Sequence, residues 1–515
     1  MLNTKMMFSK TVFWLLFSAL ICFSIVERFL FSMQSDTSMQ ISVLENMMRG
    51  MVLGVDVLEV STPMAICIFL PGIYIGKIFG ITSEFGIYIT CYLLFFVSIY
   101  LLYRIDRKCK LLDQQTRPYF YLGYVFLYTF YYQDIFAQRE YFTVLMMIPY
   151  LGLEAAYLTP KKSEISFWEK ACSGLLMGLG SSVKPHFLLI FICFTLYGLY
   201  RERTLKVLFS PEKIFFYISY VIYFLWCYYT YPEYFSFMRE YLLKNYVGDY
   251  AYWLTMLRQP HTISYIYMFL VVCIIRYKLL RGLWPAFFTV CFAASIIFFL
   301  IYMIQRKGFA YHNYPAFSLL FLCFLLTCYD GARVLLEKNV KQTDIFCFKG
   351  GMVLLSLFCL TDGFTTLQVT PSKTEVEKAV SQFVQHPTML SLSPSLSDGH
   401  PLVRNLKGRW VGTYPSIWGA IHIHPDEFPL ILNENFDDLP LDKRELFMNR
   451  KKVSLEQLAT VADDIKERKP DIVIMHQNEV WKSFVLAQPD IQNALKDYEL
   501  VARPGVLEIW KRKEI

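Results

Sequence analysis

The sequence has 515 residues, of which 55% are hydrophobic and only 18% are charged. A soluble protein of this length needs roughly a quarter of its residues charged to cover its surface. The deficit indicates that much of the chain lies in a bilayer. The net charge of +7 comes from basic residues clustered between apolar runs. That arrangement is typical of membrane orientation, and without a basic-aromatic patch we expect no nucleic-acid partner.

Apolar runs long enough to cross the hydrocarbon core predict about eleven transmembrane helices. They lie near residues 11–32, 84–103, 118–133, 141–158, 168–183, 187–200, 213–230, 260–280, 284–304, 313–329 and 345–362. The first run follows Lys5 and Lys10. We interpret it as a retained signal anchor, because no small-residue cleavage site follows it and many further spans do.

The apolar segment Pro63–Gly80 decides the orientation of every later span. It contains Pro71 and Lys77, so we expect short helices in the membrane interface and not a further crossing. The N-terminus and all the dense basic loops then lie on the cytoplasmic side. Six segments fall on the outer side, namely 33–62, 134–140, 184–186, 231–259, 305–312 and everything after about residue 365.

The last part of the chain changes character and predicts a soluble α/β domain. The predicted domains are therefore a transmembrane domain over 1–364 and an outer α/β domain over 365–515. The expected elements of the second are a helix over 453–468, a strand over 472–475, a helix over 489–497 and a terminal hairpin over 498–501 and 506–511. All thirteen cysteines precede this domain, and none forms a CxxC pair. His422 and His424 share a face of a possible strand, and we interpret them as surface residues.

Three acids stand out in the first outer segment. Asp36 precedes a helical stretch, and Asp56 and Glu59 lie three residues apart in front of the interface segment. A carboxylate in this position could take the proton of an acceptor hydroxyl and so activate it as a nucleophile. The alternative is that all three are ordinary solvated loop acids.

The second outer segment concentrates polar side chains between two aromatic-rich spans. Asp134, Gln138, Arg139 and Glu140 all lie within it. Arg139 could bind a phosphate, or it could simply neutralise the neighbouring acids Asp134 and Glu140.

Two further outer segments carry cations and imidazoles. Lys184 and His186 flank a proline, and Lys307, Tyr311 and His312 follow one another within six residues. Lysine is a compact phosphate partner, histidine can move a proton, and tyrosine can stack on a sugar. The alternatives are a snorkelling lysine at a proline break and an interfacial belt of anchoring side chains.

The acids and cations converge on one face of the predicted membrane domain. Transfer of a group from a lipid phosphate needs this mixture, because cations stabilise the departing phosphate while a carboxylate takes the proton of the acceptor. A channel would instead place its charges deep within the spans, which carry few.

In this order the motifs resemble those of the GT-C glycosyltransferases. This superfamily includes the protein O-mannosyltransferases and the lipid A aminoarabinose transferases, and the resemblance is closest to a bacterial subgroup of GT-C-like membrane proteins. It rests on the ordered segments 56–59, 138–140, 184–186 and 307–312 and spans about residues 10–330. The chain departs from the pattern at Gly54, where tyrosine is common, and at Ser61-Thr62, where Asn-Pro is expected.

The resemblance implies a polytopic α-helical fold and a set of site residues. It implies Asp56 as the catalytic base with Glu59 in support, and Asp134 as a second acid for whose role Glu140 competes. The implied contacts to the donor phosphate or its carrier are Arg139, Lys184, His186, Lys307 and His312. The implied supporting residues are Asp36, Gln138, Glu140 and Tyr311.

The resemblance also implies the reaction and its location. The donor would be a sugar on polyprenyl phosphate, transferred with inversion to a hydroxyl or amine of a lipid, glycan or protein. The protein would lie in a bacterial inner membrane, in contact with membrane lipids, with a cytoplasmic N-terminus and a periplasmic C-terminal domain. The sequence shows no dedicated metal cage, so neither a metal nor another cofactor is expected.

Three other classes of protein remain open. A transporter or flippase of lipid-linked glycans would predict inverted repeats and broken helices, and none is visible. An O-antigen polymerase or ligase would use arginines in a large outer loop, and the segment 231–259 contains Arg239, Lys244 and Arg258. A non-catalytic assembly factor would bind a partner through its C-terminal domain.

Overall fold

The computed structural model describes residues 10–131, 135–161, 164–241, 253–280, 284–337, 374–420, 430 and 441–513. The chain divides into two compact units. The helical unit comprises Met1–Phe29, Pro71–Leu225 and Tyr250–Val369, and the mixed unit comprises Leu30–Leu70, Trp226–Asp249 and Thr370–Ile515. The domain boundary predicted near residue 365 lies outside the described residues.

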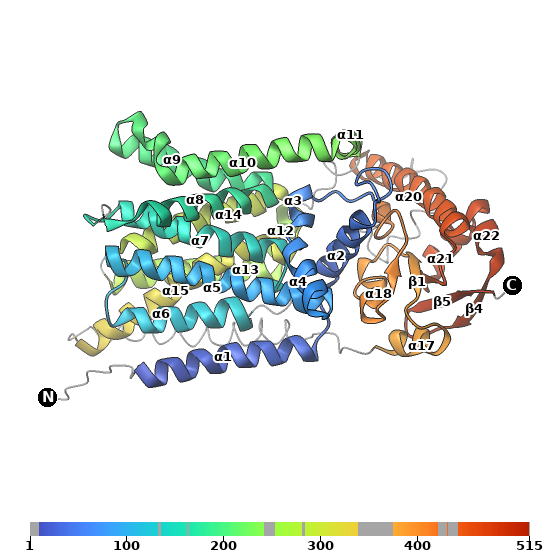
Figure 1. Ribbon diagram of the computed structural model, residues 1–515, viewed down its shortest axis with the longest axis horizontal. Helices are drawn as coiled ribbons and strands as arrows, with labels where there is room; N and C mark the ends of the chain where they lie inside the picture. The colour runs from blue at the N-terminus through green and yellow to red at the C-terminus, as the bar shows by residue number, and fades with distance from the viewer. Residues whose placement is uncertain are drawn as a thin grey trace. The chain divides into compact units, whose positions relative to one another are not determined.

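Long helices running side by side make up most of the helical unit (Figure 1). They are α1 (Lys10–Leu30), α4 (Leu70–Phe79), α5 (Ser83–Cys109), α6 (Thr116–Val125), α7 (Arg139–Tyr157), α8 (Phe167–Val183), α9 (Leu188–Glu202), α10 (Pro211–Thr230), α12 (Trp253–Arg258), α13 (Pro260–Lys278), α14 (Ala286–Gln305) and α15 (Ala310–Glu337). The π-helical turn η1 (Phe126–Tyr131) extends α6. The 3-10 turns η4 (Pro185–Phe187) and η5 (Leu205–Phe209) precede α9 and α10.

The predicted spans coincide with helices wherever the chain is described. Ten of the eleven match α1, α5, α6 with η1, α7, α8, α9, α10, α13, α14 and α15, and the eleventh, near 345–362, lies outside the described residues. By length and composition, five described helices can cross a membrane, or six if α10 and α11 (Pro232–Tyr241) count as one bent span. The interface segment forms α3 (Pro63–Cys67) and α4, and at about 1.5 Å per residue neither is long enough to cross.

Small residues bring neighbouring helices of this unit into close contact. A Cβ on Gly86 of α5 would lie 2.0 Å from the Gly72 carbonyl oxygen of α4. A Cβ on Gly174 of α8 would lie 2.0 Å from the Glu212 carbonyl oxygen of α10. Such close approach of backbones is typical of helix packing within membranes.

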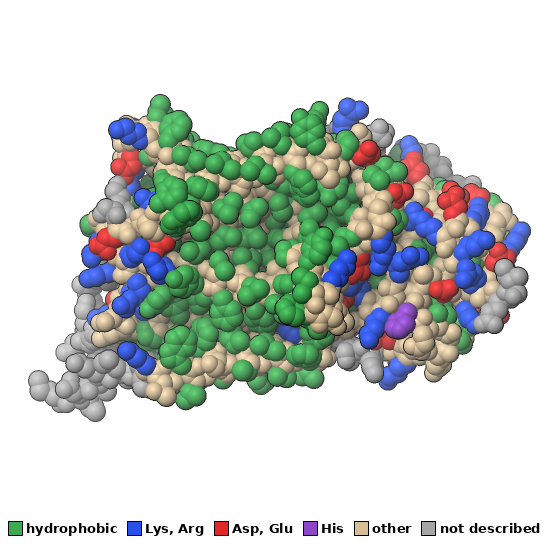
Figure 2. All heavy atoms as spheres, viewed as in Figure 1, with side chains coloured by type: hydrophobic (Ala, Val, Ile, Leu, Met, Phe, Trp, Pro, Cys, Tyr) green, Lys and Arg blue, Asp and Glu red, His purple; other side chains and the backbone are tan. Residues whose placement is uncertain are grey.

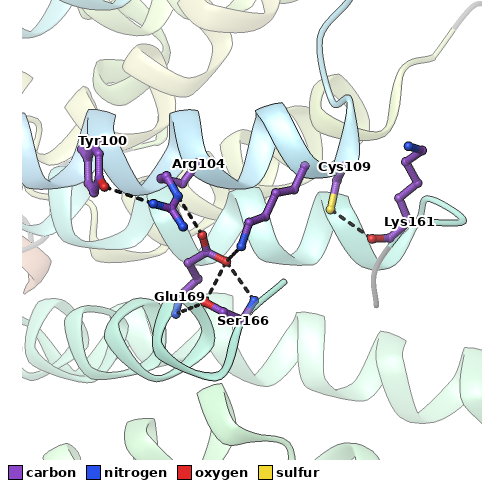
Figure 3. Close-up of polar contacts among 7 residues, drawn as sticks. Tyr100, Arg104, Cys109, Lys161, Ser166 and Glu169 are labelled. Atoms are coloured by element: carbon purple, nitrogen blue, oxygen red, sulfur yellow. Dashed lines mark hydrogen bonds and ion pairs between the residues drawn. The ribbon is translucent and has the colours of Figure 1, made fainter. Parts of the chain in front are cut away.

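The N-terminus of α8 is fixed by a capping box. Ser166 and Glu169 exchange hydrogen bonds between side chain and backbone, and this satisfies two donors that a helix start leaves open. The Glu169 carboxylate also binds Arg104 at 3.1 Å and Lys108 at 2.7 Å, so it joins α8 to the end of α5 (Figure 3).

The outer surface of the helical unit is largely apolar. Figure 2 shows hydrophobic side chains over most of its visible face, with charged side chains gathered at the end where α1 begins. Large side chains such as Phe23, Leu93 and Ile222 are exposed on it. Exposed apolar surface on this scale would aggregate in water, so the protein is an integral membrane protein.

The mixed unit contains a five-stranded sheet in the order β2-β1-β3-β5-β4. The strands are β1 (Thr388–Leu392), β2 (Arg409–Trp410), β3 (Ile472–His476), β4 (Tyr498–Ala502) and β5 (Leu507–Arg512). β1 pairs in parallel with β2 and β3, and β5 pairs antiparallel with β3 and β4. The predicted strand and terminal hairpin are confirmed as β3 and as β4 with β5.

Helices surround this sheet. They are α17 (Glu375–Phe383), α18 (Leu402–Asn405), α20 (Leu441–Arg468), α21 (Glu479–Leu486) and α22 (Pro489–Ala494). The helix expected over 453–468 is therefore confirmed but begins twelve residues earlier. The helix expected over 489–497 is α22, which ends in the 3-10 turn η10 (Leu495–Asp497). The core is apolar and centres on Trp481, Ile472 and Ile474, all fully buried.

The mixed unit also contains the first outer segment. After α1 the chain forms α2 (Ser35–Met48), a tight turn over 52–57, and α3. Gln34 caps α2, since its Oε1 accepts hydrogen bonds from the backbone N–H groups of Asp36 and Thr37. The segment that carries three of the predicted acids is thus part of the same compact unit as the C-terminal sheet.

Candidate functional site

An ion pair between Lys184 and Glu140 lies at the centre of the candidate site in the helical unit. Glu140 is in the first turn of α7, where a carboxylate also interacts favourably with the helix dipole. Lys184 follows the last residue of α8, and its Nζ donates to Glu140 Oε1. The Glu140 side chain is fully buried, and that of Lys184 is 13% exposed. The Lys184 ammonium also lies 5.5 Å from the ring centroid of Tyr311.

His186 lies two residues beyond Lys184 in the turn η4. Its Nε2 lies 2.8 Å from Nε2 of Gln305, at the end of α14. An amide nitrogen can only donate, so the imidazole Nε2 accepts and the proton of the neutral ring is on Nδ1. Burial, with a further contribution from the charge of Lys184, lowers the pKa of His186 to about 3. The ring is therefore neutral at physiological pH.

Several positive charges act on His312 at the start of α15. Lys184, Arg139 and Lys307 lie close enough to act electrostatically on its buried ring, as does His186. We call these five residues together with Glu140 the cationic cluster. Its three permanent cations outnumber its single carboxylate, and this excess suits a phosphate group.

Glycine and aromatic residues shape the loop that carries Lys307. Gly308 has φ +74°, a conformation that other residues adopt only with strain. The rings of Phe309 and Tyr311 stack with their centroids 5.4 Å apart, and the edge of His312 meets Tyr311 at 4.5 Å. The predicted residues Tyr311 and His312 are thus held together by local packing.

Arg28 is a buried cation that sequence reasoning missed. It lies near the end of α1 with a side chain only 9% exposed, and it donates to the Thr129 carbonyl oxygen at 3.0 Å. Its guanidinium lies 3.9 Å from the ring centroid of Phe136, in the segment that leads to Glu140. The signal in the sequence was the pair Glu27-Arg28 inside an otherwise apolar run, which is costly unless it has a role.

In the mixed unit, Glu59 is a fully enclosed hydrogen-bond acceptor. Its side chain is 1% exposed. Its Oε1 accepts hydrogen bonds from Gln40 Nε2 at 3.3 Å, from the Ser61 backbone N–H at 3.0 Å and from Ser61 Oγ at 2.5 Å. This arrangement fixes the chain after the turn against α2, so Glu59 orients the segment.

Asp56 occupies the turn itself and remains half-buried. Its Oδ2 accepts the Val52 backbone N–H at 2.8 Å, and its own N–H donates to the Val52 carbonyl oxygen at 2.9 Å. These bonds hold the carboxylate at the tip of a closed loop. The second carboxylate oxygen and the partial exposure leave Asp56 able to meet a ligand.

Gly54 explains where the sequence departs from the family pattern. Its φ is +93°, and a Cβ there would lie 2.8 Å from backbone atoms of Glu233 and Tyr234 in α11. A tyrosine cannot fit at this position, so the turn differs in conformation from one that carries the tyrosine of the family pattern. The acid that follows it, Asp56, is nevertheless presented on the turn.

Residues of the C-terminal part of the mixed unit hold the acidic segment in place. The Leu58 backbone N–H, between Asp56 and Glu59, donates to the Thr413 carbonyl oxygen at 3.0 Å. Asn46 Nδ2 donates to the Trp410 carbonyl oxygen at 3.0 Å. Arg404 binds Glu45 through both terminal nitrogens, at 3.0 and 3.2 Å. The C-terminal domain therefore supports the loop directly.

Two further predicted residues, Asp36 and Gln138, lie at the starts of helices. Asp36 lies in the first turn of α2, and Gln138 is the buried residue that precedes α7. Asp134, His422 and His424 lie outside the described residues. Within the described part of the chain, no group of three or more His, Cys, Asp or Glu side chains could hold a metal ion.

Comparison with known proteins confirms the fold. The chain is similar to two crystal structures of ArnT from Cupriavidus metallidurans, one bound to undecaprenyl phosphate and one in the apo state. The TM-scores are 0.54 and 0.55 at 13% and 12% sequence identity, and 98% of each chain is covered in both comparisons. No protein-family model matches the sequence, and no curated protein matches it. The chain thus has the same overall fold as ArnT over nearly its full length, a polytopic helical protein with a C-terminal α/β domain.

Proposed function

We propose that this protein is a membrane glycosyltransferase that transfers a sugar from a polyprenyl-phosphate donor to a hydroxyl or amine of an acceptor. The observation that carries the proposal is the cationic cluster, in which Arg139, Lys184 and Lys307 gather around a buried imidazole. The fold adds support, because an ArnT of the same architecture has been crystallised with undecaprenyl phosphate bound.

In the proposed reaction the cationic cluster binds the phosphate of the donor. The acceptor oxygen or nitrogen attacks the anomeric carbon, and the bond from this carbon to the phosphate oxygen breaks. Polyprenyl phosphate then leaves with the bonding electrons, and Lys184, Arg139 and Lys307 stabilise its growing negative charge. Attack from the face opposite the leaving group inverts the anomeric centre.

Asp56 is the proposed general base. It is half-exposed at the tip of a closed turn, so it can reach an acceptor, whereas Glu59 is enclosed by Gln40 and Ser61. A carboxylate that takes the acceptor's proton as the new bond forms accelerates transfer by about 10²- to 10⁴-fold. Glu59 positions the turn, and Asp134 is proposed as a second acid.

The proposed location follows from the same assignments. The protein would lie in a bacterial inner membrane with its N-terminus cytoplasmic. The acidic segment, the cationic cluster and the C-terminal domain would all lie on the periplasmic side, where the acceptor is a lipid, a glycan or a protein.

The test measures release of polyprenyl phosphate. The lipid-linked sugar that co-purifies with the protein would be identified by mass spectrometry and supplied to purified protein in liposomes. Asp56→Asn is expected to lower the transfer rate at least a hundredfold. Asp463→Asn removes the same charge from an exposed position in α20 and should leave the rate unchanged. Normal product formation by the Asp56→Asn protein contradicts the assignment of the base.

A further inference from the structure

A cavity lies in the helical unit, away from the cationic cluster. It has a volume of about 410 Å³ and is lined by residues of α7, α8, α9, η5 and α10. We call it the α7–α10 pocket. Lys170 lines it, and Lys184 of the cationic cluster follows the other end of the same helix, about 21 Å away at the rise of an α-helix. The proposed transfer reaction makes no use of this pocket.

The floor of the pocket contains buried ionisable side chains. Lys213 of α10 binds Glu154 of α7 at 2.6 Å, and their side chains are only 2% and 8% exposed. Lys213 also donates to the Tyr150 hydroxyl. Ion pairs inside an apolar bundle are costly, and in membrane proteins they mark binding sites or pathways.

Glu212 is the floor residue with unused hydrogen-bonding capacity. It is 1% exposed, and its Oε1 accepts a hydrogen bond from Ser210 Oγ at 2.5 Å. Neither its Oε2 nor the buried hydroxyl of Tyr157 makes a hydrogen bond of normal length and angle with any described residue, although these two side chains lie close enough to interact with each other. A buried carboxylate oxygen without a donor is unfavourable. A ligand that brings a positively charged donor would satisfy it.

The rim of the pocket is basic. Lys170, Arg201 and Lys206 line it, and Arg201 binds Glu202 at 2.5 Å. Within the described residues, neither Lys170 nor Lys206 has an ion-pair partner.

The nearby basic residues of α5, in contrast, do have an ion-pair partner. Glu169 binds both Arg104 and Lys108 (Figure 3). Glu169, which is next to Lys170 in the sequence, is therefore already paired with Arg104 and Lys108. The lysines at the rim remain available to bind an anionic group.

The surroundings indicate a lipid. Leu158, Phe194 and Val290 contribute apolar walls. In η5, Leu205 and Phe209 are 69% and 72% exposed on either side of Lys206. Exposed apolar side chains beside a lysine at the end of the helices are typical of a membrane interface. The ligand therefore combines an apolar part, an anionic group and a cationic donor.

We infer that the α7–α10 pocket binds a zwitterionic phospholipid with a phosphoethanolamine headgroup. The phosphate lies at Lys170 and Lys206, and the ammonium donates to Glu212 Oε2 beside the Tyr157 hydroxyl. A purely anionic lipid would satisfy the rim, but it would leave the buried carboxylate without a donor. A cavity of about 410 Å³ is large enough for the headgroup of such a lipid.

The test uses full-length protein in detergent and does not depend on transfer activity, since no sugar donor is added. The protein is incubated with equal amounts of phosphatidylethanolamine and phosphatidylglycerol that carry the same acyl chains, and retained lipids are counted by native mass spectrometry. The wild type is expected to retain phosphatidylethanolamine about tenfold over phosphatidylglycerol, as for one charge-assisted hydrogen bond. Glu212→Gln should abolish this preference.

Substitutions of two exposed lysines add a second test of the pocket and its control. Lys206→Ala should lower retention of both lipids in a protein whose core is intact, because Lys206 is on the surface. Lys278→Ala removes an exposed lysine that does not line the pocket and should change neither lipid. Equal retention of the two lipids by the wild type overturns the inference, as does an unchanged preference in Glu212→Gln.

Discussion

The ion pair between Arg404 and Glu45 offers a direct measure of how firmly the C-terminal domain holds the acidic segment. Both terminal nitrogens of Arg404 bind the Glu45 carboxylate, and the side chains are 10% and 21% exposed. Exposed ion pairs contribute up to about 1 kcal/mol, whereas hydrogen bonds to charged groups contribute about 1.5–3 kcal/mol. For two such bonds at this burial we expect a coupling energy of about 1.5 kcal/mol, or roughly tenfold in the equilibrium for loop opening.

A double-mutant cycle with Arg404→Ala and Glu45→Ala measures this coupling. Hydrogen exchange of the peptide over residues 51–62 reports opening, because the Leu58 amide is protected by its bond to the Thr413 carbonyl. Exchange of this peptide should accelerate about tenfold in either single variant and little further in the double variant. Lys466→Ala, which removes two exposed ion pairs, should leave the exchange rate unchanged. A coupling energy below about 0.3 kcal/mol would refute the proposed support of the loop.

Three further outcomes are expected. Lys184→Met leaves the buried carboxylate of Glu140 uncompensated and should cost about 3–5 kcal/mol of stability. The double variant K184M/E140Q should regain most of this loss in thermal unfolding while binding of undecaprenyl phosphate stays impaired, and normal binding would argue against the cationic cluster. Gly54→Ala should destabilise by at least about 1 kcal/mol more than Gly50→Ala, because both residues have positive φ but only Gly54 meets other backbone atoms. Equal losses in unfolding experiments would show that this close approach is unimportant. Burial lowers the pKa of His400 to about 3, so the unfolded chain takes up its proton more readily. The stability linked to His400 is therefore complete above about pH 6.5 and declines toward pH 3, by up to about 1.4 kcal/mol per pH unit. His400→Phe should flatten this dependence in unfolding titrations between pH 7 and pH 5, since neither ring nitrogen bonds a described residue.

Local patterns in the sequence predict the elements of this protein well. A run of apolar residues forms a helix in lipid because every backbone group must find its partner within the segment. The spans near 84–103 and 260–280 accordingly became α5 and α13. In the C-terminal domain, an apolar run and a Pro-Gly turn were sufficient to predict β3 and the hairpin of β4 and β5.

The candidate site was predictable in part, for the same reason. Lys184, His186, Lys307 and His312 each lie in short polar stretches between apolar runs, so their position near helix ends follows from the sequence. Arg28 was missed because it lies inside an apolar run, where only its burial against Thr129 and Phe136 gives it significance.

What the sequence by itself determined was which segments are apolar, which turn and which carry charge, since those properties belong to neighbouring residues. Only the tertiary structure determined which charged side chains pair with one another. Glu140 meets Lys184 across 44 positions, and Glu45 meets Arg404 across 359. The physical reason is that such pairs depend on how whole helices and strands pack, and no local periodicity encodes which distant carboxylate a buried cation will find.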